Sequence, residues 1–199
     1  DKVALVTGGG SGIGKAIAAA FVGAGATTFI SGRDQARLDR AAAETGAVAI
    51  AADVSREADV AALFAAIGER AAGLDVLVNN AGISGPIANA EDMDMAAWDE
   101  TMAINVRSII LCTRAAVPML RRRGGGSIIN MSSLMGLRGY PMRAAYSASK
   151  FAVIGITEAT AHEVGCDNIR VNALCPGAIS GELMDRVIAR RAAVQARPP

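Results

Sequence analysis

Short apolar segments alternate with longer, alanine-rich segments along the whole chain. The short segments have the length and β-branched content of buried strands, whereas the long ones carry apolar residues at helical spacing. We therefore predict six strands, with a helix after each of the first five. The strands are expected at Val3–Val6, Thr27–Ile30, Val48–Ala52, Leu74–Val78, Ser127–Met131 and Ile169–Leu174. The helices are expected at Lys15–Val22, Arg33–Glu44, Glu57–Ala72, Met95–Arg122, with a break near Pro118, and Tyr146–Val164.

This alternation indicates βαβ units, and hence a parallel sheet that is covered on both faces. Right-handed crossovers then lead to an α/β fold with a doubly wound, Rossmann-type sheet in three layers. No linker or repeat interrupts the pattern, so residues 1–199 are expected to form a single domain. Ligands of such sheets bind beyond the carboxyl ends of the strands. Functional residues are therefore expected in the segments that follow the strands.

Composition narrows the classes of function. Twenty Lys and Arg residues face 19 Asp and Glu residues, and only 4% of residues are aromatic, which argues against nucleic-acid binding. No run approaches the roughly 20 apolar residues that a membrane span needs. The three cysteines lack the spacing of metal ligands, and a single His cannot complete a site. We expect a cytoplasmic protein with reduced thiols, and neither a metal nor a membrane or nucleic-acid partner.

A glycine-rich turn joins the first predicted strand to the first helix. Glycines at this place permit a tight turn and let the backbone approach a pyrophosphate, which the helix N-terminus attracts. The spacing differs from GxGxxG, and no GK[ST] follows, so a nucleoside-triphosphate loop is excluded. Dinucleotide binding is the favoured interpretation, and a purely structural turn is the alternative. The candidate residues are Gly8, Ser11, Gly12, Ile13 and Gly14.

The end of the second predicted strand bears on the choice of dinucleotide. An acidic residue there would bind the ribose 2′-hydroxyl of NAD. The chain has Gly32-Arg33 instead, and the planar guanidinium suits a 2′-phosphate. We interpret Asp34 as the cap of the next helix. NADP is therefore favoured, NAD remains possible, and a solvated Arg33 is the alternative.

Tyr146 and Lys150 lie four residues apart in a predicted helix, so they share one face. A tyrosine with a pKa near 10 is a poor base at neutral pH, but a nearby ammonium and a cationic oxidised nicotinamide would favour its phenolate. Ser133 follows the fifth strand, where its hydroxyl could meet a substrate carbonyl; a turn or capping serine is the alternative. Asn105 lies inside the long fourth helix, where asparagine is unfavourable, so it could bend the helix or order a water.

Together these motifs resemble the short-chain dehydrogenase/reductase family in its single-domain form. The resemblance implies that Tyr146 is the general acid/base, that Lys150 lowers its pKa and binds the nicotinamide ribose, that Ser133 orients the carbonyl or alcohol, and that Asn105 anchors a proton-relay water. It implies a cofactor-binding surface of Asp53 and Val54 beside adenine, Asn80, Ala81 and Gly82 along the cofactor, and Pro176, Gly177 and Ile179 beside the nicotinamide.

Two features depart from the family pattern. Gly181 stands where the family commonly has Thr, although Ser180 is adjacent. The chain also stops several tens of residues before the family usually does, so we expect that a C-terminal segment is lacking. The segments Ile83–Met95 and Ser180–Pro199 are interpreted as loops.

The favoured function is an NADP(H)-preferring oxidoreductase that interconverts a ketone and a secondary alcohol, with a 3-oxoacyl-thioester reductase as one candidate. Two alternatives stay open: a dinucleotide-binding sensor or scaffold without turnover, and a sugar-nucleotide epimerase or dehydratase. The expected partner is a small carbonyl or alcohol substrate. Two helices are apolar on more than one stripe, which together with the resemblance predicts a homodimer or homotetramer. The residues concerned are Ile104, Ile109, Ile110, Val117 and Leu120 on one helix and Phe151, Val153, Ile154 and Ile156 on the other.

Overall fold

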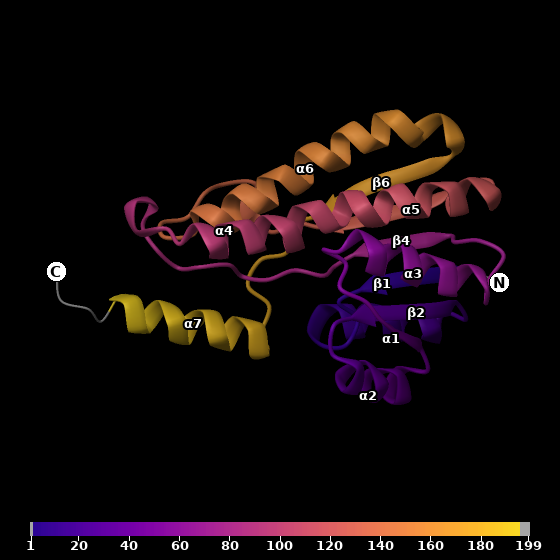
Figure 1. Cartoon of the computed structure of the whole chain (residues 1–199), viewed down its shortest axis with the longest axis horizontal. Coiled ribbons are helices and arrows are strands. Elements are labelled where there is room, and N and C mark those ends of the chain that lie inside the picture. Colours follow the sequence, from indigo (N-terminus) through magenta and orange to yellow (C-terminus); the bar gives the residue numbers. More distant parts are fainter. Residues whose placement is uncertain (1, 196–199) are drawn as a thin grey trace.

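The computed structural model describes residues 2–195 (Figure 1). The strands are β1 (Val3–Thr7), β2 (Thr27–Gly32), β3 (Val48–Ala51), β4 (Val76–Asn79), β5 (Gly126–Met131) and β6 (Ile169–Leu174). The α-helices are α1 (Gly12–Gly23), α2 (Gln35–Thr45), α3 (Glu57–Gly68), α4 (Met95–Met102), α5 (Ser108–Arg122), α6 (Ala144–Val164) and α7 (Glu182–Gln195). Single turns occupy Ala90–Asp92, Leu134–Gly136 and Gly165–Asp167, and a π-helical turn occupies Ala103–Arg107.

All six strands are parallel and lie in the order β3-β2-β1-β4-β5-β6. This arrangement confirms the predicted doubly wound α/β fold. The strand order reverses between β1 and β4, which are paired with Val6 opposite Val78. Two chain segments therefore leave the sheet side by side at its carboxyl edge. The region between them, called the crevice below, is where sheets of this kind bind their ligands.

Helices cover both faces of the sheet. One apolar cluster joins the strands to α3, α5 and α6, and a second joins them to α1 and α2. β1 is buried along its whole length, because it lies in the middle of the sheet between these two layers. The burial of continuous apolar strands is the main source of stability for such a sheet.

Met95–Arg122, predicted as one long helix with a break near Pro118, is interrupted at a different place. The helix continues through Pro118, and the break lies instead at the π-helical turn that contains Asn105. Met95–Arg122 is long and apolar enough to cross a membrane by length and composition alone. However, 56% of its most apolar window is buried inside the protein, and core helices of soluble proteins meet the same criterion. No apolar stretch long enough to span a membrane was expected from the sequence, so the length and hydropathy of Met95–Arg122 differ from that expectation.

The segment after β6 also corrects the sequence interpretation. Ser180–Pro199 was expected to be a loop, but Glu182–Gln195 forms α7, which lies apart from the sheet (Figure 1). Residues 196–199 lie outside the described part of the chain. Ile83–Met95 is irregular as expected, apart from the single turn Ala90–Asp92.

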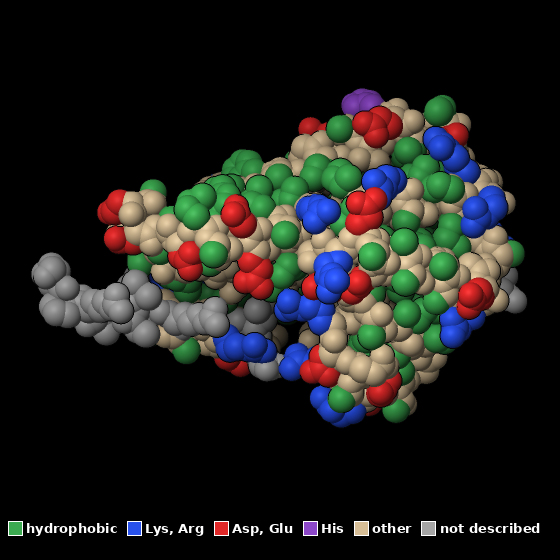
Figure 2. Space-filling view, viewed as in Figure 1, with side chains coloured by type: hydrophobic (Ala, Val, Ile, Leu, Met, Phe, Trp, Pro, Cys, Tyr) green, Lys and Arg blue, Asp and Glu red, His purple; other side chains and the backbone are tan. Residues whose placement is uncertain are grey.

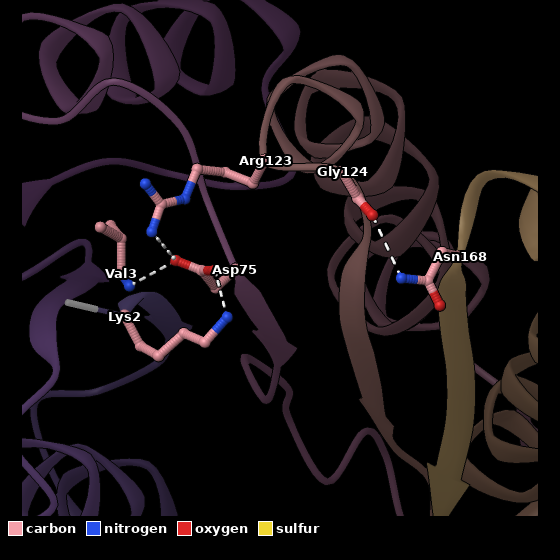
Figure 3. Close-up of polar contacts among 6 residues, drawn as sticks. All are labelled: Lys2, Val3, Asp75, Arg123, Gly124 and Asn168. Atoms are coloured by element: carbon pink, nitrogen blue, oxygen red, sulfur yellow. Dashed lines mark hydrogen bonds and ion pairs between the residues drawn. The ribbon is translucent and has the colours of Figure 1, made fainter.

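A buried carboxylate fastens the edge of the sheet opposite the crevice (Figure 3). Asp75 accepts from the Lys2 ammonium at 2.8 Å and from the Val3 N–H at 2.9 Å, and it pairs with Arg123 at 3.2 Å. Burial raises the pKa of Asp75, but these three donors outweigh it, so the pKa lies below its ordinary value. The carboxylate thereby joins the start of β1 and the end of α5 to the start of β4.

Candidate active site

Reciprocal hydrogen bonds tie the end of β1 to the end of β4. The Asn80 side chain donates to the carbonyl oxygens of Thr7 at 2.9 Å and Gly8 at 3.2 Å. In return, Thr7 Oγ1 accepts from the N–H groups of Asn80 and Ala81, each at 3.0 Å. The glycine loop is thus held against the segment that follows β4, at the reversal of strand order. Sequence reasoning placed these two segments in one site but missed the part that the Thr7 side chain plays in joining them.

Close backbone contacts explain the glycines of this loop. A Cβ on Gly8, whose φ is +67°, would lie 2.9 Å from the Ala81 Cα, and a Cβ on Gly14 would lie 2.3 Å from the Gly8 carbonyl oxygen. Side chains at these positions would therefore push the loop away from Asn80–Gly82. Gly12 has a φ of +52° and open space around it, so its backbone conformation alone favours glycine.

The N-terminus of α1 faces the same crevice and can receive an anion. Ser11 has an extended backbone, and its side chain makes no capping hydrogen bond within the described chain. The first turn, with the partly exposed Ile13, therefore keeps N–H groups that await an acceptor. The glycine backbone and this helix end could hold the pyrophosphate of a dinucleotide, which is the role predicted for them.

A shallow hollow of about 250 Å³ lies beside the ends of β2 and β3. Its lining includes the exposed Arg33 and the carboxylates of Asp53 and Asp59. Burial raises the pKa of Asp53, but hydrogen bonds from Ser55 and the charges of Arg33 and Arg56 outweigh it, so the pKa is lowered. Asp34 caps α2 by accepting from the Arg37 N–H at 3.0 Å, which matches the role we expected for it. The carboxylate nearest to Arg33 in the sequence is therefore engaged in the cap of α2, whereas Asp53 and Asp59 lie in the same hollow as Arg33.

Val54, expected beside the adenine, lies near this hollow in the sequence, but its side chain does not face it. It follows Asp53 beside this hollow, but its side chain is buried in the apolar cluster under α3. Only its backbone is thus available to an adenine ring.

The first two turns of α6 bring the predicted acid/base pair together. Lys150 Nζ lies 5.6 Å from the centroid of the Tyr146 ring and donates to the Met131 carbonyl at 2.7 Å. Lys150 is buried despite its charge. The Ser132 hydroxyl donates to the Lys150 carbonyl at 2.8 Å, which fixes α6 against the end of β5. Tyr146 and Lys150 therefore face the crevice together from one helix face.

Burial governs the protonation of this pair. It raises the pKa of Tyr146, against which a hydrogen bond with Ser133 and the charge of Arg143 act. It also lowers the pKa of Lys150 to about 8. The sequence argument expected the Tyr146 pKa to move toward neutrality. Within the protein alone it moves upward instead, because desolvation of the phenolate outweighs the neighbouring donors.

Ser133 has the capping role that was expected as an alternative, and its hydroxyl also lies beside Tyr146. Its Oγ accepts from the Met135 N–H at 3.2 Å and so caps the turn Leu134–Gly136, and it also lies within hydrogen-bonding reach of Tyr146. The Leu134 N–H donates to the Pro176 carbonyl at 3.0 Å. The segment with Pro176, Gly177 and Ile179 is thereby held beside Ser133, at the edge of the crevice where it was predicted.

Asn105 is buried in the π-helical turn and faces Gly82 and Lys150. A Cβ on Gly82 would lie 3.2 Å from Asn105 Oδ1 and 3.7 Å from Lys150 Nζ, so the absence of a side chain lets the three groups converge. π-helical turns are frequent at functional sites. The Asn105 side chain bonds to Ile83 and Ser149, which occupies both N–H donors of its amide and one acceptor site of Oδ1.

Arg143 was missed by sequence reasoning. Its guanidinium carbon lies 4.8 Å from the centroid of the Tyr146 ring, and the side chain is 6% exposed. Only its place three residues before Tyr146 hinted at such a contact. Within the described chain, no three His, Cys, Asp or Glu side chains gather as metal ligands.

Comparisons with known proteins agree with this geometry. The model of the short chain dehydrogenase family matches residues 2–192. The chain is 40% identical to 2-(S)-hydroxypropyl-CoM dehydrogenase 3 of Xanthobacter autotrophicus, over 90% of this chain and 72% of that protein. It is also 40% identical to the 3beta-hydroxysteroid dehydrogenase of Mediterraneibacter gnavus, over 94% and 69%. The crystal structure of 3-ketoacyl-(acyl-carrier-protein) reductase from Brucella melitensis complexed with NADH superposes with a TM-score of 0.89 at 39% identity, covering 92% of this chain and 78% of that one.

Proposed function

The chain belongs to the short-chain dehydrogenase family, and we propose that it is an NADP(H)-preferring enzyme that interconverts a ketone and a secondary alcohol. Membership makes it an oxidoreductase that acts on CH–OH donors. The observation that carries the finer proposal is the convergence of Ser133, Tyr146 and Lys150 on the crevice beside the glycine loop.

We assign each side chain of the site one task. Tyr146 gives a proton to the substrate oxygen in reduction and takes it back in oxidation, through its phenolic oxygen. Ser133 donates a hydrogen bond to the same substrate oxygen and orients it. Lys150 supplies a positive charge near the phenol and donors for the nicotinamide ribose. The nicotinamide, when bound, supplies or accepts the hydride and brings a positive charge in its oxidised form.

The proposed cofactor surface runs along the carboxyl edge of the sheet. Gly8, Ser11, Gly12, Ile13 and Gly14 would hold the pyrophosphate, with Asp53 and Val54 at the adenine, Asn80, Ala81 and Gly82 along the middle, and Pro176, Gly177 and Ile179 at the nicotinamide. The close packing of Gly8 against Ala81 supports this, because a Cβ on Gly8 would lie 2.9 Å from the Ala81 Cα, so the glycine keeps the loop beside Asn80–Gly82.

The preference for NADP rests on Arg33. An exposed guanidinium beside a hollow, with Asp34 engaged as a helix cap, suits the 2′-phosphate. The related ketoacyl reductase was crystallised with NADH. We therefore propose that this enzyme also uses NAD(H), but less efficiently than NADP(H).

We also propose a cytoplasmic homodimer or homotetramer whose substrate is a small carbonyl compound or alcohol, 3-oxoacyl thioesters being one candidate. The similarity to a ketoacyl reductase supports that candidate. Cys112, Cys166 and Cys175 are free thiols, which supports the proposal of a reducing compartment.

A panel of ketones that includes a 3-oxoacyl thioester tests the proposal. The full-length protein is mixed with each ketone and either NADPH or NADH, and loss of reduced-nicotinamide absorbance is followed. We expect turnover of at least one ketone, and a higher kcat/KM for NADPH than for NADH. Cofactor binding without turnover of any ketone or alcohol would indicate a sensor instead.

A further inference from the structure

The guanidinium of Arg143 is buried beside Tyr146, and two of its three nitrogens have no hydrogen-bond partner among the described residues. These two are Nε and Nη1, although only 6% of the residue is exposed. Arginine is almost never buried so fully unless it is paired. The contact with the Tyr146 ring attracts the charge, but N–H donors need acceptor atoms, which a ring face does not replace.

Backbone hydrogen bonds hold the segment that carries Arg143 in place. Met142 has a φ of +63°, which is uncommon for a residue with a side chain, and its carbonyl accepts from the Ala88 N–H at 3.1 Å. The Arg143 carbonyl then accepts from the Ser147 N–H at 2.8 Å in the first turn of α6. The backbone of Arg143 is therefore held between the segment after β4 and the start of α6, and a ligand that binds there has to displace the groups that cover Nε and Nη1.

Other charges leave the neighbourhood of Arg143 positive. Burial lowers the pKa of Arg143, the charge of Tyr146 acts against that, and the charge of Arg191 on α7 lowers it further. A guanidinium nevertheless stays protonated in proteins.

We propose, resting on the proposed function, that Arg143 binds an oxyanion on the substrate, so that the enzyme prefers ketones and alcohols with a carboxylate or a similar group near the reacting carbon. An oxyanion supplies the acceptor atoms that Nε and Nη1 lack, and a guanidinium binds such groups with a planar set of donors. Because Arg143 contacts Tyr146, the bound oxyanion lies within a few bonds of the reacting carbonyl.

Pairs of substrates that differ only in charge test this inference. The full-length enzyme reduces 2-oxo, 3-oxo and 4-oxo carboxylates and the methyl ester of each, and kcat/KM is measured for acid and ester. We expect at least one acid to exceed its ester by about tenfold or more. Arg143→Met should lower that acid-to-ester ratio by about 10- to 150-fold, the loss expected for a hydrogen bond between charged groups. Arg143→Lys should give an intermediate ratio, because it keeps the charge and loses the planar donors.

The ratio separates substrate binding from any effect on Tyr146. A change in the tyrosine alters both members of a pair equally and cancels. Arg138→Met is the matched control, since Arg138 also lies over a tyrosine, 5.4 Å from the Tyr140 ring, but is exposed and donates to the Tyr140 hydroxyl. If no wild-type pair favours the acid, or if Arg143→Met lowers acid and ester alike, the inference is wrong. The comparison of acid and ester with the wild type needs no variant, so it tests the inference even if Arg143→Met does not fold.

A binding measurement keeps this inference apart from the proposed function. Calorimetry with NADPH present compares butyrate with butyramide, neither of which reacts. We expect butyrate to bind more tightly to the wild type and to lose that advantage in Arg143→Lys and Arg143→Met. Selective butyrate binding without turnover of any ketone would refute the proposed function and retain the oxyanion site. Turnover of ketones without selectivity for acids or for butyrate would support the proposed function and refute the oxyanion site.

Discussion

The side chain of Asn105 holds both backbone groups of Ile83. Its Oδ1 accepts from the Ile83 N–H at 2.8 Å, and its Nδ2 donates to the Ile83 carbonyl at 2.9 Å and to Ser149 Oγ at 3.0 Å. The segment that leaves β4 is thereby fastened both to the π-helical turn and to α6. One buried amide thus fixes the distance between the segment after β4 and the helix that carries Tyr146.

Replacing this amide should loosen the segment. We expect Asn105→Ala to lower the free energy of unfolding by about 2–3 kcal/mol, because two backbone groups of Ile83 lose their partner in a largely buried place. KM for the substrate should rise and kcat should fall, because the segment borders the site. Chemical denaturation and steady-state kinetics measure these effects. Asn89→Ala is the control, since Asn89 is exposed and makes no capping bond. Equal stability of the two variants would contradict the role of Asn105.

How far the sequence could predict this site is clear from Asn105 itself. Its poor fit to a helix interior correctly marked an irregularity, whereas the expected break at Pro118 was wrong because an exposed helix face tolerates the lost hydrogen bond there. Helical spacing placed Tyr146 and Lys150 together, because i,i+4 geometry is local. The approach of Ile83 to Asn105 joins residues 22 positions apart, which no periodicity encodes.

Two other features lay beyond sequence reasoning for related reasons. Arg143 looked like an ordinary polar residue, because its burial depends on the left-handed backbone of Met142 and on the pairing with Ala88. The helix α7 was interpreted as a loop because its apolar residues do not define a buried face, and Ile188 on it is 59% exposed. Local patterns predicted the elements of the sheet, but not these tertiary contacts.

Removing the phenolic hydroxyl of Tyr146 tests the proposed acid/base. Tyr146→Phe should lower kcat by at least about 10²- to 10⁴-fold, the usual contribution of a positioned proton donor, while NADPH affinity stays near that of the wild type. Lys150→Ala should weaken both turnover and cofactor affinity. Tyr140→Phe, at the other tyrosine of the chain, is the control and should retain activity. Near-normal turnover by Tyr146→Phe would refute the mechanism.

The buried amine of Lys150 should make stability depend on pH. Its pKa of about 8 in the folded protein lies below its ordinary value of 10.5, so between these values the unfolded chain binds a proton that the folded protein does not. The free energy of unfolding of the wild type therefore rises with pH across this range. Relative to Lys150→Met, the wild type should gain up to about 3 kcal/mol of stability between pH 8 and pH 10.5. Urea denaturation from pH 7 to pH 10.5 measures the difference between the two proteins. A difference in stability between the two proteins that stays constant across this pH range would show that the Lys150 amine is not desolvated.

Arg33 is expected to determine the choice of cofactor. Loss of its contact with a 2′-phosphate should raise KM for NADPH by about 10- to 150-fold in Arg33→Ala, while KM for NADH changes little. Arg40→Ala, at an exposed arginine on α2, should leave both values unchanged. Equal effects of Arg33→Ala on the two cofactors, or a wild-type preference for NADH, would show that Arg33 does not bind the phosphate.

The outer faces of α5 and α6 are expected to pair with a second copy of the chain. The apolar residues first assigned to two stripes divide in the structure: Ile109, Leu120 and Val153 are buried in the protein, whereas Ile110 and Phe151 remain 47% and 46% exposed. Hydrophobic side chains cover much of this region of the surface (Figure 2). Such a patch on neighbouring helices suits a two-fold, isologous contact, which would also hold the start of α6 rigid.

Sedimentation equilibrium of the full-length protein at micromolar concentration measures this assembly. We expect a dimer or a tetramer for the wild type. Phe151→Glu combined with Ile110→Glu should dissociate it, because each change would bury an unpaired charge at the interface. Leu137→Glu is the control, since Leu137 is 59% exposed and lies outside both helices. A monomeric wild type would refute the pairing, and dissociation by Leu137→Glu alone would place the interface elsewhere.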